Sequence, residues 1–138
     1  MAETGMSFAQ LQEILKGSPY HRLFNMDLVA TQAEDELQVR IQYTNAVERI
    51  PGAGQYHGGV LASLGDIAGS FLIAQVTGMG GSTIHFSIDY LRPAVKTEVT
   101  ARARVRRIGK TVGFVDVDIQ DGSGQLVAVC RGVYAVMR

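Results

Sequence analysis

A single carboxylate, Asp66, stands in an otherwise uncharged and strongly apolar stretch of the chain. Between Ile50 and Ile88 it is the only formally charged residue, apart from two histidines. An ionised carboxylate is too costly to bury without partners, so it must meet a hydrogen-bond donor, open onto a cavity, or take up a proton. Ser63 and Ser70 are spaced so that all three side chains share one face of a helix. A structural hydrogen bond and a catalytic role are both compatible with this pattern.

The tripeptide His57-Gly58-Gly59 precedes that carboxylate, at the point where a helix is expected to begin. A helix N-terminus presents unpaired N–H groups and a positive dipole end, which suit a carbonyl oxygen that gains negative charge. Gly58 has no side chain to keep a ligand from its own amide. Along one helix this amide and Asp66 lie about 11 Å apart, too far to share a reacting atom. A second copy of the helix, antiparallel across a dimer, would bring the two groups together.

One long helix, predicted over residues 59–77, positions both groups and would be roughly 28 Å in length. Its apolar residues recur at helical spacing around almost the whole circumference, which is typical of an interior helix. Ala62, Gly65 and Gly69 form a stripe of small residues. Because a glycine inside a helix costs about 1 kcal/mol relative to alanine, the stripe indicates a packing role. We expect it to contact the second helix of a dimer.

Strand patterns flank the predicted helix on both sides, and a short N-terminal helix and turn are expected within residues 1–20. Period-two alternation predicts strands over residues 23–30, 37–43, 83–90, 99–106, 114–119 and 126–136. Runs of strands with a single long helix argue for an α+β class. We therefore expect one domain over residues 1–138, with a curved antiparallel sheet wrapped around a central helix.

Two details of side-chain direction follow from strand alternation. In the strand over residues 83–90, strict alternation places Thr83 on the face of His85, opposite Ile84. In the following hairpin, an arginine row is expected to face an aspartate row across antiparallel strands, giving ion pairs. The rows consist of Arg102, Arg104 and Arg106, and of Asp116 and Asp118.

Composition excludes several classes of function. The 138 residues are 46% hydrophobic and 19% charged, and thirteen basic residues balance thirteen acidic ones, so nothing marks a nucleic-acid binder. One cysteine, Cys130, excludes an internal disulfide, and three dispersed histidines offer no metal-ligand set. The N-terminus lacks the pattern of a signal peptide, and no apolar run is expected to span a membrane. We expect a cytoplasmic protein without a metal or cofactor.

The motifs together resemble a known family, the hotdog-fold acyl-CoA thioesterases of the phenylacetate-pathway type. The resemblance rests on HGGVLASLGDIAGSFLIA, STIHFSIDYLRPA, ARVRRIGKTVGFVDVDI and LVAVCRG, and covers residues 37–138. Its most specific marker is His-Gly-Gly followed by an acid seven residues after the last glycine. The resemblance implies a hotdog fold and a homodimer, or a dimer of dimers, with each active site at the subunit interface.

The resemblance also implies roles for individual residues. The Gly58 N–H would polarise a thioester carbonyl, and Asp66 of the other subunit would activate water or attack that carbonyl. Ser70 and Thr83 match positions whose hydroxyls hold the water or the aspartate, and His57 orients the site. Coenzyme A would be part of the substrate rather than a cofactor. Residues expected to bind the substrate are Gln55, Gly59, Arg92, Arg107 and Lys110.

The chain departs from the family pattern at Pro51, where the family has Asn or Gln six residues before the histidine as a second carbonyl donor. Proline cannot donate, so Gln55 would substitute, or His57 would take more of the role. Two alternatives stay open: a hotdog dehydratase acting on acyl thioesters with a His/acid pair, and an acyl-CoA-binding module without catalysis.

Overall fold

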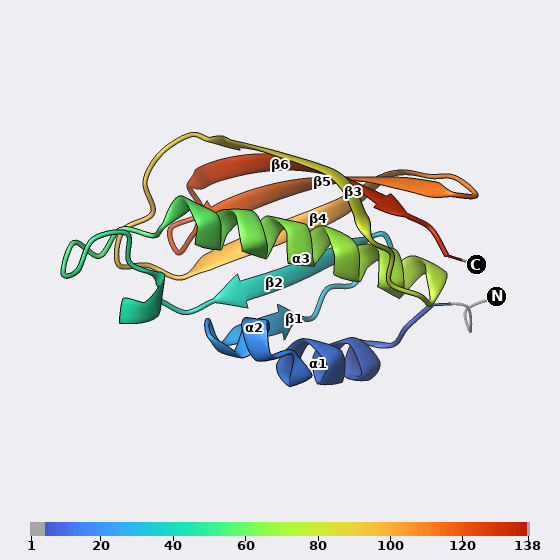
Figure 1. Cartoon of the computed structure of the whole chain (residues 1–138), viewed down its shortest axis with the longest axis horizontal. Coiled ribbons are helices and arrows are strands. Elements are labelled where there is room, and N and C mark those ends of the chain that lie inside the picture. The colour runs from blue at the N-terminus through green and yellow to red at the C-terminus, as the bar shows by residue number, and fades with distance from the viewer. Residues whose placement is uncertain (1–4, 138) are drawn as a thin grey trace.

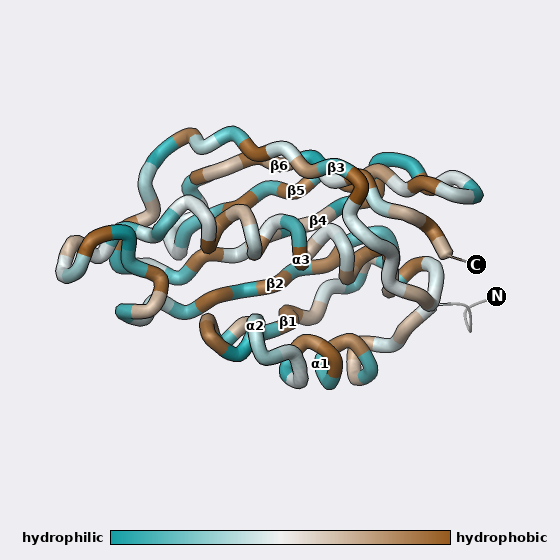
Figure 2. Tube along the Cα trace, in the orientation of Figure 1, coloured by the Kyte–Doolittle hydropathy of each residue, from teal (hydrophilic) through white to brown (hydrophobic). Residues whose placement is uncertain are grey.

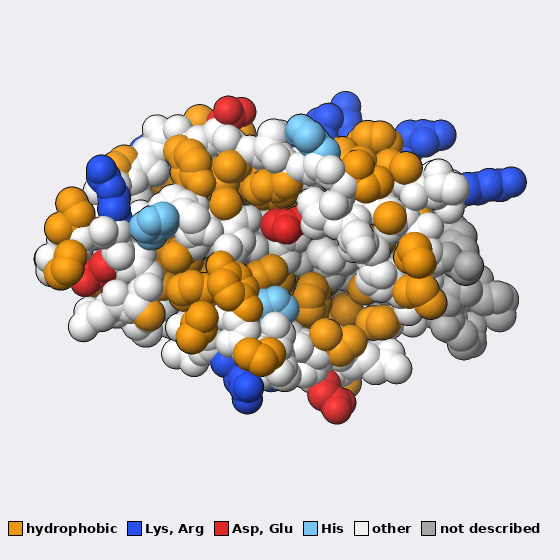
Figure 3. Space-filling model, viewed as in Figure 1, with side chains coloured by type: hydrophobic (Ala, Val, Ile, Leu, Met, Phe, Trp, Pro, Cys, Tyr) orange, Lys and Arg blue, Asp and Glu red, His pale blue; other side chains and the backbone are white. Residues whose placement is uncertain are grey.

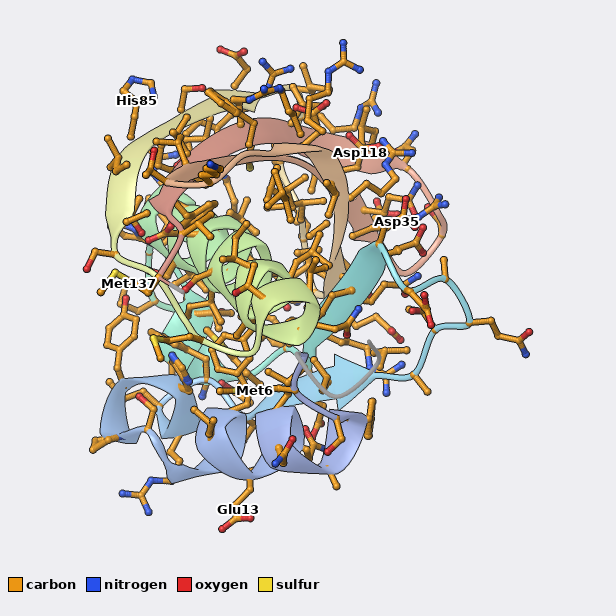
Figure 4. The ribbon with its side chains drawn as sticks, turned by 90° about the vertical axis from the view of Figure 1, so that its right-hand side faces the viewer. Met6, Glu13, Asp35, His85, Asp118 and Met137 are labelled. Carbon is orange, nitrogen blue, oxygen red and sulfur yellow. The ribbon has the colours of Figure 1, made fainter. Side chains whose placement is uncertain are left out.

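A six-stranded antiparallel sheet curves around one long helix in the computed structural model, which describes residues 5–137 (Figure 1). The elements are α1 (Phe8–Gly17), α2 (Pro19–Arg22), β1 (Met26–Val29), β2 (Glu36–Ile41), the 3-10 helix η2 (Asn45–Val47), α3 (Gly58–Thr77), β3 (Thr83–Tyr90), β4 (Val99–Ile108), β5 (Val112–Asp121) and β6 (Leu126–Ala135). Viewed from one end of the molecule, the sheet covers α3 above and to one side, and α1 lies below it (Figure 4). This α+β architecture is the expected hotdog arrangement, and the class predicted from periodicity is confirmed.

The strand order is β1-β2-β4-β5-β6-β3, so β3 pairs with β6 and not with β4, its successor in the chain. The segment from Leu91 to Glu98 carries the chain across the sheet from one edge to its middle. The first strand is shorter than the predicted range 23–30, because the Ser18-Pro19 turn opens into α2, with proline at a position that suits a helix start. β3 is left as an edge strand whose outer side has no strand neighbour within residues 5–137.

The concave face of the sheet supplies the core against which α3 packs. Its side chains come from alternate positions of β2, β4, β5 and β6, such as Val39, Ala101, Val117 and Tyr134, all fully buried. The hydropathy of the chain alternates along these strands accordingly (Figure 2). Charged side chains of the same strands point away from α3, as Asp118 does in Figure 4.

The expected ion pairs lie on that convex face. Arg104 pairs with Asp118 at 3.1 Å, and Asp116 accepts from Arg131 and lies 3.9 Å from Arg106. β4 and β5 place Arg104 opposite Asp116 and Arg102 opposite Asp118, so the predicted register is confirmed. Arg102 itself pairs with Glu36 of the neighbouring strand, and its guanidinium lowers the pKa of that carboxyl.

The small-residue stripe of α3 does not serve the purpose predicted from sequence. Gly65 and Gly69 are buried against the protein's own sheet: a Cβ at Gly65 would lie 2.9 Å from the Cys130 Sγ, and one at Gly69 would lie 2.2 Å from the Tyr134 hydroxyl. The Tyr134 hydroxyl donates to the Asp66 carbonyl at 3.2 Å. The two glycines therefore allow α3 to approach the sheet closely, and the expectation that they contact a second helix is wrong.

The length and composition of α3 bear on the expectation that no apolar run spans a membrane. By length and composition alone, the 20-residue α3 could cross a membrane. Buried core helices share these properties, and 50% of the most apolar stretch of α3 is buried inside the protein. The remaining surface of this apolar helix is uncovered in a single chain, and it carries Asp66.

We predict that Gly69→Ala destabilises the protein even though alanine is the better helix former. Its Cβ would meet the Tyr134 hydroxyl, so overpacking should lower the free energy of unfolding by about 1–3 kcal/mol. Gly17→Ala, at a helical glycine with open space around it, is the matched control and should leave stability within about 0.5 kcal/mol. Chemical denaturation measures both, and equal stability of the two variants would contradict the packing role.

Candidate active site

The first turn of α3 forms one half of the site. His57 is the N-cap, and its Nδ1 accepts a hydrogen bond from the Gly59 N–H at 2.9 Å. Within residues 5–137, the Gly58 N–H has no acceptor. It belongs to the terminal turn of a 20-residue helix, where the dipole favours negative charge. Gly58 thus offers a free donor of the kind predicted from sequence.

The second half of the site is Asp66, near the middle of α3 on its half-buried face. Thr83 donates to the Asp66 Oδ1 at 2.9 Å. Among residues 5–137, no cationic side chain pairs with this carboxylate. Figure 3 shows an acidic side chain near the middle of the molecule, with hydrophobic side chains above and below it. Oδ2 is therefore left for a ligand or water.

A β-bulge brings Thr83 to Asp66. Thr83 pairs with Tyr134 and His85 pairs with Val133, so Ile84 is an extra residue on β3. Directly opposed residues of antiparallel strands share a face, and Tyr134 points toward α3, so Thr83 does too. His85 points away from the helix (Figure 4). Strict alternation, which places Thr83 and His85 together, is wrong at this position.

The loop before α3 is held by one carboxylate. Glu48 accepts from the Gly52 N–H at 3.1 Å, from the Gly54 N–H at 2.9 Å and from the Tyr43 hydroxyl. The hydrogen bond from Tyr43, followed by the one from Gly52, holds the pKa of Glu48 below its usual range. Further backbone bonds join Arg49 to Gln55 and His57 to Val47, which fixes where the helix begins.

Of the other predicted site residues, Ser70 lies near Asp66, whereas Gln55 and Pro51 lie in the loop before α3. Ser70 lies one turn beyond Asp66 on the same face, half-buried, and its hydroxyl has no hydrogen-bond partner within residues 5–137. Gln55 lies beside Gly54 and forms a backbone bridge with Val95. Pro51 lies in an exposed turn of the loop before α3.

The three basic residues predicted to bind the substrate do not form one cluster. Arg107 and Lys110 are exposed at the turn between β4 and β5, and within residues 5–137 neither forms an ion pair. Arg92 donates to the Leu126 carbonyl at 2.7 Å, at the start of β6. β4 separates these positions by about 30 Å, so one bound nucleotide cannot meet all three within a chain.

Two tyrosines contact the backbone of α3, and sequence reasoning missed both contacts. Tyr90 donates to the Gly58 carbonyl at 2.7 Å, and Tyr134 donates to the Asp66 carbonyl. Period-two alternation over residues 83–90 gives the face of the strand on which Tyr90 lies. The pattern could not show which carbonyl the hydroxyl reaches, because the contact joins segments 32 residues apart.

A cavity of about 700 Å³ lies elsewhere, between the N-terminal segment, the β1–β2 turn and the C-terminal end of α3. None of the predicted site residues lines it. It lacks the combination of a free helix amide and an unpaired carboxylate, so we place the site on α3 rather than in this cavity.

Comparison with known proteins identifies the same region of the chain. The sequence pattern of the thioesterase superfamily matches residues 53–128, which contain both Gly58 and Asp66. A Halobacterium salinarum protein with the provisional name of esterase is 33% identical over 121 residues, 80% of each chain. The acyl-coenzyme A thioesterase PaaI of Escherichia coli is 32% identical over 99 residues, 71% of this chain and 70% of that one. A solved thioesterase structure from Haemophilus influenzae superposes with a TM-score of 0.87 at 21% identity, covering 100% of this chain and 96% of that one.

The role of Glu48 in the loop predicts a pH-dependent contribution to stability. Because its pKa is lowered on folding, the contribution is present above the unfolded pKa and is lost as pH falls through the folded pKa. Glu48→Gln should therefore melt below the wild type near pH 7, and the difference should shrink as the pH falls below about 4. Melting curves between pH 3 and pH 8 measure this, and a difference independent of pH would contradict it.

Proposed function

The chain belongs to the thioesterase superfamily and is a thioester hydrolase, and from this premise we propose that it hydrolyses acyl-CoA thioesters to a free acid and coenzyme A. The observation that carries the proposal is that one helix bears two groups that are available to a substrate. The Gly58 N–H has no acceptor, and the Asp66 carboxylate has no cationic partner, among residues 5–137. These are the donor and the base that acyl transfer requires.

The Gly58 amide would accept the developing oxyanion. As water adds to the thioester carbon, the carbonyl oxygen gains negative charge, and a donor fixed at a helix N-terminus stabilises that charge without reorganisation. The Gly59 amide is engaged with His57, so Gly58 is the donor left for the substrate. When the tetrahedral intermediate collapses, the C–S bond breaks and the sulfur leaves as a thiolate that takes up a proton.

Asp66 would take a proton from the attacking water, or attack the carbonyl carbon itself. Thr83 holds one carboxylate oxygen at 2.9 Å, which leaves the other for this task. Ser70, one turn further along, is positioned to hold that water.

The two halves of the site would come from different subunits. In one chain, Gly58 and Asp66 are separated by about 12 Å of helix. The uncovered face of α3 and the free edge of β3, with Ile84 58% exposed, offer apolar surface and unpaired backbone groups to a second copy. A two-fold pairing of the β3 edges would continue the sheet and set two α3 helices antiparallel.

The same two-fold arrangement bears on the coenzyme A end of the substrate. Arg107 and Lys110 lie at the end of the sheet remote from Gly58 in their own chain, so an antiparallel partner would bring them toward the other subunit's helix N-terminus. We assign them to the anionic nucleotide, with Gly59 and Gln55 near the thioester. Arg92, bonded to the Leu126 carbonyl, is the weakest member of the predicted set.

The contact of His57 with Gly59 argues against a dehydratase. A neutral imidazole whose Nδ1 accepts a hydrogen bond carries its proton on Nε2. In this tautomer His57 is a donor and cannot abstract a proton from a substrate carbon. It would instead assist the Gly58 amide at the carbonyl oxygen, in place of the Asn or Gln that the chain lacks.

Asp66→Asn tests the proposed base. Asparagine still accepts from Thr83 through its carbonyl oxygen, so the fold should be retained, whereas kcat for thiol release should fall by about 10²–10⁴-fold. Asp118→Asn, a carboxylate of the convex face, is the matched control and should keep its activity. A thiol-release assay over short, medium, branched and aryl acyl-CoAs, with melting curves on the same samples, provides the measurement. Near-wild-type turnover by a stable Asp66→Asn protein would end the proposal.

Mixed dimers test the shared site. Gly58→Pro removes the free N–H at a helix position where proline is tolerated, and His57 already has the extended ψ of 134° that proline requires before it. Gly58→Ala, which keeps the N–H but adds the same Cβ near Tyr90, is its control. Gly58→Pro should lower kcat by about 10²–10³-fold.

Co-refolding Gly58→Pro with Asp66→Asn should then recover activity. Statistical mixing makes about half of the dimers heterodimers, and each heterodimer has one doubly altered site and one intact site. About one quarter of wild-type activity is therefore expected. No recovery, despite heterodimers shown by differential tags, would place both groups in one subunit's site. A wild-type protein that remains monomeric at micromolar concentration would contradict the arrangement as well.

A further inference from the structure

The peptide group between Gly58 and Gly59 is held at both of its polar ends. Its carbonyl oxygen accepts a hydrogen bond from the Tyr90 hydroxyl at 2.7 Å. Its N–H donates to the His57 Nδ1 at 2.9 Å. A peptide group is planar, so two bonds on opposite sides fix its orientation.

His57, the residue before Gly58, is fixed as well. The His57 N–H donates to the Val47 carbonyl at 2.7 Å, and the His57 carbonyl accepts from Val60 at 3.0 Å. Gly58 is thus a flexible residue between two anchored peptides. The Gly58 N–H belongs to the His57–Gly58 peptide, so its direction depends on the peptides on both sides of Gly58, and the Tyr90 bond restrains the second of these.

Tyr90 is itself anchored by the sheet. It is the last residue of β3, opposite Ala128 on β6, and the next residue, Leu91, donates to the Val127 carbonyl at 2.9 Å. The ring lies against Gly58, since a Cβ at that glycine would be 3.3 Å from the ring and its hydroxyl oxygen. Burial raises the pKa of the Tyr90 hydroxyl, so it remains a donor across the neutral range.

We propose that Tyr90 is a positioning residue for thioester hydrolysis, which holds the Gly58 peptide so that the Gly58 N–H points at the substrate carbonyl. The proposal rests on the proposed function, since it gives that N–H the role of oxyanion donor. Tyr90 acts through the backbone of Gly58 and not by contact with the reacting atoms.

Tyr90→Phe keeps the ring and removes the hydroxyl. Loss of one hydrogen bond in the oxyanion donor should lower kcat for thiol release by about two- to twelve-fold, with KM changed by less than about twofold. Tyr20→Phe is the matched control: Tyr20 is 48% exposed against 51% for Tyr90, and its hydroxyl lies 2.7 Å from the Ser63 Oγ. Its kcat should be unchanged. Equal losses in both variants, or a fall in melting temperature without a change in kcat for Tyr90→Phe, would overturn the proposal.

The double variant Tyr90→Phe/Gly58→Pro identifies the route of the effect. Where Gly58 has no N–H, the Tyr90 hydroxyl has nothing to position, so adding Tyr90→Phe to Gly58→Pro should have no further effect on kcat. Gly58→Ala keeps the N–H, and there the Tyr90→Phe effect should persist. A full effect in the Gly58→Pro background would mean that Tyr90 contacts the substrate directly, which overturns the positioning role.

Amide hydrogen exchange in the ligand-free protein provides a readout that is independent of turnover. The Gly59 amide, which donates to His57, should exchange faster in Tyr90→Phe and at the wild-type rate in Tyr20→Phe. Unchanged exchange in Tyr90→Phe overturns the proposal. If the wild-type protein releases no thiol from any acyl-CoA, the proposed function fails, and the exchange result still decides whether Tyr90 orders the peptide.

Discussion

The close approach of α3 to the concave face of the sheet is the constraint on which the rest of the structure depends. Gly65 and Gly69 leave space that the Cys130 thiol and the Tyr134 hydroxyl occupy, at distances no Cβ could tolerate. Tyr134 is fully buried, and its hydroxyl finds its acceptor in the Asp66 carbonyl. These contacts fix the distance of α3 from the sheet and its rotation about its own axis, although the helix is apolar enough for complete burial. That rotation leaves the face carrying Asp66 uncovered.

The rotation of α3 accounts for how one apolar helix can carry the proposed site. Its buried side satisfies the core, so its other side is free to carry a carboxylate whose only side-chain partner within residues 5–137 is Thr83. The N-terminal end of the same helix offers the Gly58 amide, which has no acceptor in the described part of the chain. Both groups are rigid because the sheet, and not a loop, supports the helix that bears them.

Small departures from regular structure set the directions of the supporting side chains. One extra residue in β3 turns Thr83 toward Asp66, and the end of the same strand sets Tyr90 against Gly58. The edge strand thus contacts both halves of the site, at its two ends. The same strand also presents its free side to a second copy of the chain, so the proposed dimer contact and the support of the site belong to one element.

The sequence by itself determined what depends on neighbouring residues and on a repeating period. It located α3 to within a residue and the start of that helix at His57-Gly58-Gly59. It also showed the alternation of the strands, the facing rows of arginine and aspartate, and the isolated Asp66. Only the tertiary structure decided that β3 pairs with β6, that Gly65 and Gly69 face the sheet, and that Arg92 lies apart from Arg107 and Lys110. The contacts of Tyr90, Tyr134 and Thr83 belong to this second group. They join segments 17 to 68 residues apart, where a shift of register by one residue turns a side chain to the opposite face, and no local pattern records that shift.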